Sequence, residues 1–76
     1  MPKLPRVSGE AAIRALERIG FVRRRQTGSH VVLRRFREEG DLGCVVPLHD
    51  ELAVGTLRGI LRQAKFTPEE FVQHLV

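Results

Sequence analysis

Residues 23–33 decide the fold, and they read Arg23-Arg24-Arg25-Gln26-Thr27-Gly28-Ser29-His30-Val31-Val32-Leu33. Three arginines end one short β-like run, a turn-forming Thr-Gly-Ser follows, and a histidine opens a second run rich in β-branched residues. The pattern predicts a β-hairpin with strands over residues 21–25 and 30–36. Such a hairpin places a titratable imidazole beside a dense group of cations.

The second predicted strand has two different faces. Side chains alternate across a strand, so Val31 and Leu33 share one face. The other face carries His30, Val32, Arg34 and Phe36. We take Val31 and Leu33 as core-facing, which leaves His30 and Arg34 on the open face. Because Val32 is also apolar, the reversed assignment stays open.

An amphipathic helix is predicted before the hairpin, from Gly9 to Ile19. Ser8 can accept hydrogen bonds from the free N–H groups of the first turn. Gly20 is well placed to end the helix in a left-handed conformation. Apolar residues at helical spacing predict one core-facing stripe, made of Ala12, Ile13, Leu16 and Ile19.

Three further elements are predicted after the hairpin. A third short strand covers residues 43–46 and is stopped by a proline. A second helix begins at Gly55-Thr56, with a buried stripe of Leu57, Ile60, Leu61 and Ala64. The capping-box spacing of Thr67 and Glu70, with Pro68 at the first helical position, starts a short terminal helix. We expect that helix to bury Phe71, Val72 and Leu75.

These elements predict one α+β domain over residues 1–76. The order is helix, three-stranded antiparallel meander, helix and short C-terminal helix, with two helices covering one face of the sheet. This two-layer arrangement is that of the double-stranded-RNA-binding fold. A chain of this length buries only about 60% of its unfolded surface, so its substrate should lie across a surface and not in a deep pocket.

The charge pattern favours a polyanionic partner. The chain has 13 Lys and Arg against 9 Asp and Glu, a net charge of +4. Seven of the arginines, and no acidic residue, fall within residues 18–37. A basic stripe of Arg58, Arg62 and Lys65 follows on the second helix. A basic cluster can also be no more than a solvated surface, so that reading stays open for both groups.

Other residues limit the classes of function. The single cysteine, Cys44, lies in an apolar run and is expected to be a buried small hydrophobe, which fits a reducing cytoplasm. No run approaches the roughly 20 apolar residues that cross a bilayer, and the N-terminus has no targeting pattern. Scattered histidines give no metal-ligand spacing, so no metal and no cofactor are expected.

His30 is the candidate for chemistry. RNA carries its own nucleophile, the 2′-hydroxyl, and an imidazole has a pKa suited to removing its proton at neutral pH. Nearby arginines, here Arg23, Arg24, Arg25 and Arg34, could stabilise charge on the phosphate. Ser29 and the backbone N–H groups near Gly28 could bind a phosphate oxygen. A lone histidine at a strand start is nonetheless more often structural than catalytic.

Two other histidines are weaker candidates. His49 follows Pro47-Leu48 in a loop that could reach the same surface, although a loop histidine beside Asp50 is commonly just hydrogen-bonded. His74 near the end of the last helix is explained by favourable placement in the helix dipole.

Taken together, the residues resemble the HicA (YcfA) family of bacterial messenger-RNA-cleaving toxins. The resemblance covers nearly the whole chain and rests on several short motifs in the family's order. These motifs are Val7-Ser8-Gly9, Gly20-Phe21, Arg25-Gln26-Thr27-Gly28-Ser29-His30, Val46-Pro47-Leu48-His49, Gly55-Thr56-Leu57-Arg58-Gly59-Ile60-Leu61-Arg62-Gln63-Ala64 and Thr67-Pro68-Glu69-Glu70-Phe71. Lys65-Phe66 departs from the pattern, since relatives tend to have a small residue such as glycine there, at a helix end.

The resemblance implies a double-stranded-RNA-binding-like fold, ribosome-independent and metal-free cleavage of RNA, and a cognate HicB-type antitoxin. The family's catalytic histidine falls on His30, and its Pro-x-His histidine falls on His49. Arg58 and Arg62 are secondary candidates for RNA contact.

Two hypotheses of function follow. The first is a toxin endoribonuclease with His30 as general base. The second is a non-catalytic RNA-binding module, although its second helix lacks the lysine-rich start expected of a double-stranded-RNA reader. A pure protein-interaction domain is hardest to reconcile with seven arginines in an acid-free run.

Overall fold

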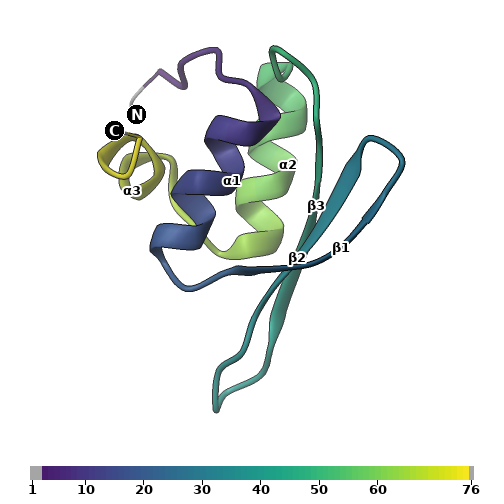
Figure 1. Ribbon diagram of the computed structural model, residues 1–76. Helices are drawn as coiled ribbons and strands as arrows, with labels where there is room; N and C mark the ends of the chain where they lie inside the picture. Colours follow the sequence, from purple (N-terminus) through teal and green to yellow (C-terminus); the bar gives the residue numbers. More distant parts are fainter. Residues whose placement is uncertain (1–2, 76) are drawn as a thin grey trace.

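The computed structural model describes residues 3–75 and shows the predicted order of elements (Figure 1). The elements are α1 (Gly9–Arg18), β1 (Val22–Thr27), β2 (His30–Arg35), β3 (Leu42–Pro47), α2 (Val54–Ala64) and α3 (Pro68–Gln73). The fold is α+β with a three-stranded antiparallel sheet in the order β1-β2-β3, which confirms the predicted class.

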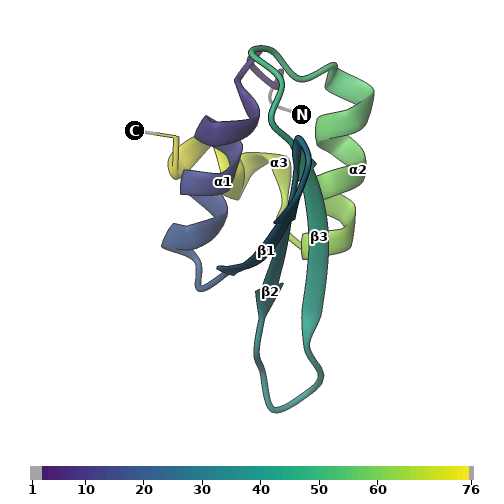
Figure 2. The same ribbon diagram turned by 45° about the vertical axis from the view of Figure 1, so that its right-hand side comes forward.

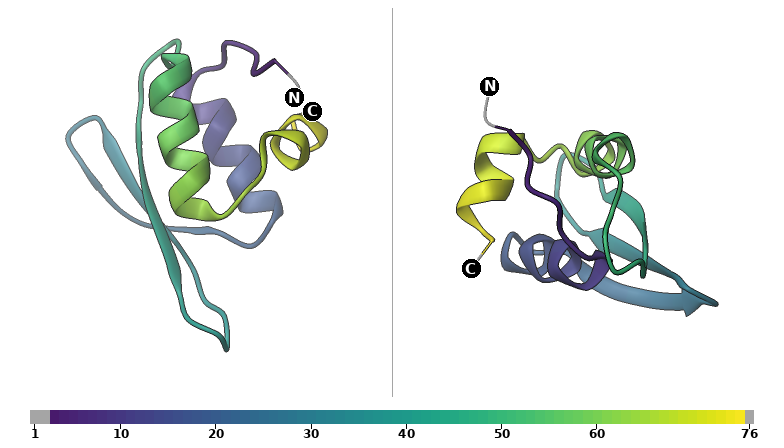
Figure 3. Two further views of the ribbon diagram at one scale, coloured as in Figure 1. Left: turned by 180° about the vertical axis from the view of Figure 1, so that it is seen from behind. Right: turned by 90° about the horizontal axis from the view of Figure 1, so that it is seen from above.

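The helices cover one face of the sheet. α1 and α2 lie side by side on the same side of the strands, and β3 runs alongside α2 (Figures 1 and 2). α3 packs against the helices on the side away from the sheet (Figure 3). The sheet therefore has a face covered by helices and an open face, and its hairpin ends extend past the helices (Figure 1).

The register confirms the predicted facing of β2. Val31 pairs with Val46 and Leu33 pairs with Cys44, and all four side chains are buried beneath the helices. Burial raises the pKa of the Cys44 thiol to about 11, so at neutral pH this side chain is an apolar residue and not a nucleophile. The covered face thus supplies the sheet's share of the core.

The ends of α1 follow the predicted signals. The Ser8 hydroxyl oxygen accepts a hydrogen bond from the N–H of Ala11 at 3.0 Å. Gly20 has a φ of +106°, a conformation that L side chains rarely adopt, and it turns the chain from α1 toward β1. The expected core stripe of α1 is buried, except that Ile19 is only partly so.

The connection from α2 to α3 is a tight turn. Lys65 ends α2 in the left-handed conformation (φ 51°, ψ 44°), which explains why a glycine suits this position. α3 begins with the predicted capping box: Glu70 N–H donates to the Thr67 hydroxyl, and Thr67 N–H donates to the Glu70 carboxylate. These hydrogen bonds lower the pKa of Glu70.

The prediction that α3 buries Val72 is wrong. Phe71 is fully buried and packs edge-on against Phe66 with 5.8 Å between ring centroids, and Leu75 is partly buried. Val72 is 38% exposed, because the single buried face of this short helix is taken by Phe71. Within residues 3–75, no helix combines the length and the apolar character needed to cross a membrane.

Candidate active site

His30 is the first residue of β2 and is exposed to solvent, as predicted. It lies opposite Thr27 on β1 and Pro47 on β3. A two-residue turn precedes it, and Gly28 in that turn has a φ of +58°, which is typical of short hairpin connections. The Gln26 side-chain amide closes the turn by donating to the carbonyl of Gly28 at 2.9 Å.

Two backbone hydrogen bonds hold this end of the hairpin. The N–H of Leu48 donates to the carbonyl of Ser29 at 2.6 Å, and the N–H of Gly9 donates to the carbonyl of His49 at 2.9 Å. The start of α1, the hairpin turn and the segment after β3 therefore meet at one place. The backbone of His49 is fixed beside the His30 turn, and its side chain is exposed.

Glycine at position 9 allows the start of α1 to approach the backbone of Pro47 and Leu48 closely. A Cβ at position 9 would lie 2.0 Å from the carbonyl oxygen of Pro47 and 3.1 Å from the Cα of Leu48. No side chain can fit at such a distance from backbone atoms without movement of the chain. Glycine at this position therefore allows α1 to support the segment that borders His30.

A β-bulge distributes the arginines of β1 over the two faces of the sheet. The register changes between Arg23, which pairs with Leu33, and Arg25, which pairs with Val32. Cross-strand partners share a face. Arg23 therefore lies on the covered side of the sheet, while Arg25 lies on the open face, two positions along from His30.

Two carboxylates of α1 neutralise the charge of Arg23. Its guanidinium forms ion pairs with the carboxylates of Glu10 and, at 3.4 Å, Glu17. The hydrogen bond to Glu10 is the main reason that the pKa of Arg23 is raised. This arginine joins the edge strand to the first helix, so part of the acid-free run seen in the sequence is compensated in three dimensions.

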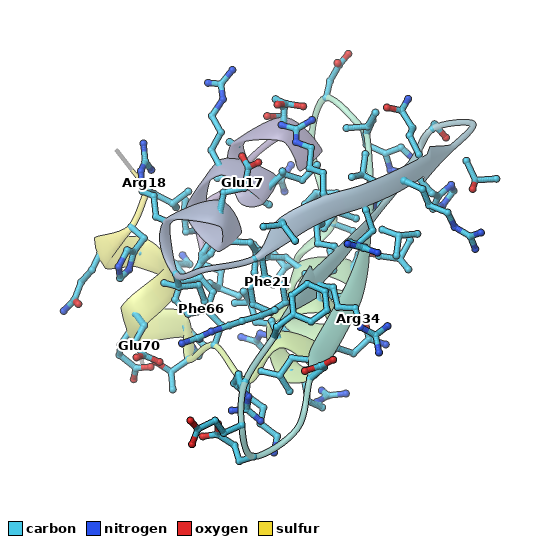
Figure 4. All side chains as sticks on the ribbon, turned by 60° about the horizontal axis from the view of Figure 1, so that its bottom comes forward. Glu17, Arg18, Phe21, Arg34, Phe66 and Glu70 are labelled. Atoms are coloured by element: carbon cyan, nitrogen blue, oxygen red, sulfur yellow. The ribbon has the colours of Figure 1, made fainter. Side chains whose placement is uncertain are left out.

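The other arginines of the strands differ in their contacts. In Figure 4 Arg34 lies beside the strands, to the right of Phe21, while Glu70 lies at the left beside α3. The Nε of Arg34 lies 3.8 Å from Asp41. The guanidinium carbon of Arg24 lies 5.6 Å from the centroid of the Phe36 ring. Within residues 3–75, no carboxylate comes within 4.0 Å of the Arg24 or Arg25 guanidinium.

The open face also carries apolar side chains. Val22 pairs with Arg34 in the register, and Val45 pairs with Val32. Val22 and Val45 are both 44% exposed. The open face is therefore an amphipathic surface with His30 at one end and arginines around exposed valines.

Arg58 and Arg62 lie apart from this surface. They are exposed on α2 and line a separate hollow with Leu61, Phe66 and Pro68.

The main hollow of the molecule lies away from the open face of the sheet. A hollow of about 480 Å³ is lined by Pro5, Val7, Ala11, Arg14, Arg18, Val72 and Leu75, none of which belongs to a strand. Residues 3–75 contain no group of three His, Cys, Asp or Glu side chains placed to hold a metal ion.

Two parts of this arrangement were missed from the sequence. The bulge has no sequence signal among three consecutive arginines, and the pairing of Arg23 with α1 depends on it. The close approach at Gly9 did have a sequence signal, because the helix begins with a glycine although glycine disfavours helices.

A family model described as the HicA toxin of bacterial toxin-antitoxin systems matches residues 9–66 of the 76-residue chain. The match begins at Gly9, spans the whole sheet and α2, and ends just before α3. A search of the curated proteins gave no match.

Proposed function

The chain belongs to the family of HicA toxins of bacterial toxin-antitoxin systems, and on that premise we propose that it is a metal-independent endoribonuclease that cleaves messenger RNA. His30 is the general base. Its exposure at the start of β2, on the same face as Arg25, is the observation that carries the proposal. An RNA strand lying across the open face could bring a ribose to this imidazole without entering a cavity.

The reaction needs few protein groups. The His30 imidazole takes the proton of a 2′-hydroxyl, and the 2′-oxygen attacks the adjacent phosphorus. The bond from phosphorus to the 5′-oxygen breaks, and that oxygen takes a proton from solvent water and leaves as a 5′-hydroxyl. The other product carries a 2′,3′-cyclic phosphate.

The arginines supply the electrostatic part. Arg25 is the nearest candidate to His30 along the open face, and Arg24 and Arg34 continue the positive surface toward the other end of β2. Preorganised cations stabilise the charge that develops on the phosphorane. Arg23 also belongs to the proposed RNA-binding set, with the smallest contribution, because Glu10 and Glu17 already neutralise it.

The hairpin turn is the proposed contact for a phosphate oxygen. Gly28 leaves the backbone open to close approach, with nothing within 4 Å of the place a Cβ would take. Ser29 presents an exposed side chain next to it. His49, Arg58 and Arg62 are secondary candidates, His49 because its backbone is fixed beside this turn.

The proposed partners are messenger RNA and a HicB-type antitoxin. Acidic groups on the antitoxin would complement the arginines and cover His30, so that the same surface serves substrate and inhibitor. The proposed location is the cytoplasm, where messenger RNA and a reduced Cys44 are both expected.

Replacement of His30 tests the proposal. A His30→Ala variant should cut a long messenger RNA at least about 100-fold more slowly than the wild type, in EDTA and low salt, while binding RNA equally well. Because His30 is exposed, its loss should not change the circular dichroism spectrum. The products should end in a cyclic phosphate.

His74→Ala is the matched control. His74 lies on the far side of the helices, with its Nδ1 2.8 Å from the carbonyl oxygen of Glu70, and its loss should leave cutting unchanged. A His49→Ala variant measured in the same assay tests its secondary role. Undiminished cutting by His30→Ala would remove His30 from the mechanism. RNA binding without strand breaks in any variant would favour the alternative, a non-catalytic RNA-binding module.

A further inference from the structure

Phe36 is an aromatic side chain that the fold does not use. All four phenylalanines lie in the described part of the chain, and Phe21, Phe66 and Phe71 are buried in the core. Phe36 is 57% exposed, just after the last residue of β2. Its ring therefore contributes little to the core.

The Phe36 ring lies among positively charged side chains. Arg24 places its guanidinium over the ring, 5.6 Å from the centroid. Continued alternation of β2 puts Phe36 on the open face with Arg34, beside the exposed Val22. The Asp41 carboxylate lies 3.8 Å from the Nε of Arg34. The patch therefore combines an exposed aromatic ring with arginines, and it suits a flat group carried on an anionic backbone.

We propose that Phe36 and Arg24 form a stacking site for one unpaired nucleobase of the RNA. The inference rests on the proposed function and adds that the substrate is single-stranded at this point. Arg24 occupies one side of the ring, and the base stacks on the other. Stacking on an aromatic side chain accepts every base, with a modest sequence preference that comes from differences in stacking strength.

The position of this site defines a distance to the reaction. Phe36 lies six positions after His30, and a strand rises about 3.3 Å per residue, so the two sites are about 20 Å apart. At the axial rise of about 3.4 Å per nucleotide in a stacked strand, this span is about six nucleotides. An extended strand needs fewer, so the stacked base should lie about three to six nucleotides from the cleaved bond.

Fluorescence quenching on an RNA that cannot be cut tests the site. A single-stranded 2′-O-methyl RNA lacks the nucleophile, and 2-aminopurine placed at successive positions reports stacking by loss of fluorescence. The full-length wild-type protein should quench the probe at one or two neighbouring positions. A Phe36→Leu variant, which keeps an apolar side chain without a π face, should abolish the quenching and bind the RNA about tenfold more weakly.

Val45→Ala is the matched control, because Val45 is an exposed apolar residue of the same face and lacks an aromatic ring. This variant should retain both quenching and most of the affinity. Unchanged quenching in Phe36→Leu would overturn the assignment and leave the patch as a surface for a protein partner. Absence of quenching by the wild-type protein would also overturn it.

Stacking and cleavage can fail independently in these experiments. The probe has no 2′-hydroxyl, so its quenching does not depend on His30. Cleavage of ordinary RNA by the Phe36→Leu variant should continue, with a relaxed nucleotide preference about three to six positions from the cut.

Discussion

The two faces of the sheet use the same three strands for different purposes. On the covered face, Val31, Leu33, Cys44 and Val46 are buried beneath α1 and α2. On the open face, the alternate positions carry His30, arginines and exposed valines. Alternate residues of β2 therefore serve stability and the proposed function, so the two should respond to different mutations.

The largest expected effect tests the covered face. A Leu33→Ala variant removes a fully buried side chain and should lower the free energy of unfolding by about 3 kcal/mol. Its neighbour Val32 faces the other way, and Val32→Ala should cost less than about 1 kcal/mol. Urea denaturation of both variants measures the contrast. Similar losses for the two would contradict the separation of faces.

A substitution in α1, on the covered side of the sheet, should also affect the proposed site on the open face. Gly9→Ala brings a Cβ into the carbonyl of Pro47 and should lower the free energy of unfolding by about 2 kcal/mol. Because the displaced segment borders the His30 turn, this helix-side change should also slow RNA cutting under conditions in which the variant remains folded.

The control for this substitution is another helical glycine. A Cβ at Gly59 in α2 meets nothing within 4 Å, so Gly59→Ala should raise stability by about 0.5 to 1 kcal/mol and leave cutting unchanged. Thermal melts and single-turnover cutting test both variants. A Gly9→Ala protein as stable and active as the wild type would show that the junction tolerates a Cβ at position 9.

The smallest expected effect compares Arg23 and Arg25, the two arginines on either side of the bulge. Arg25→Ala should weaken binding of single-stranded RNA about fivefold, or ~1 kcal/mol, because Arg25 lies on the open face without a carboxylate partner. It should also lower the magnitude of the salt slope of binding by about 0.7. Arg23→Ala should change both quantities less, because Glu10 and Glu17 neutralise that residue. Filter binding at several salt concentrations decides which is larger.

Much of the fold could be predicted from the sequence. The helical stripes, the Ser8 cap, the capping box at Thr67 and the alternation of Val31 and Leu33 are local signals, and the structure confirms each of them. The predicted burial of Val72 was wrong, because a six-residue helix has room to bury only one narrow face and Phe71 occupies it.

The site was less accessible to sequence reasoning. The exposure of His30 followed from strand alternation and is confirmed, while its catalytic role remains a prediction. The division of the arginines could not be predicted, because one bulged residue reverses the facing of every side chain beyond it. The ion pairs of Arg23 join residues 6 and 13 positions apart, so they appear only in the folded chain.

The turn at Lys65 has a consequence for the dynamics of the domain. A left-handed conformation costs a non-glycine residue about 1 kcal/mol, and the helix that follows it is only six residues long. α3 should therefore detach in local openings that leave the sheet, α1 and α2 intact. Amide hydrogens in α3 should exchange with solvent earlier than those of β2, and a protease should reach the chain first at this joint.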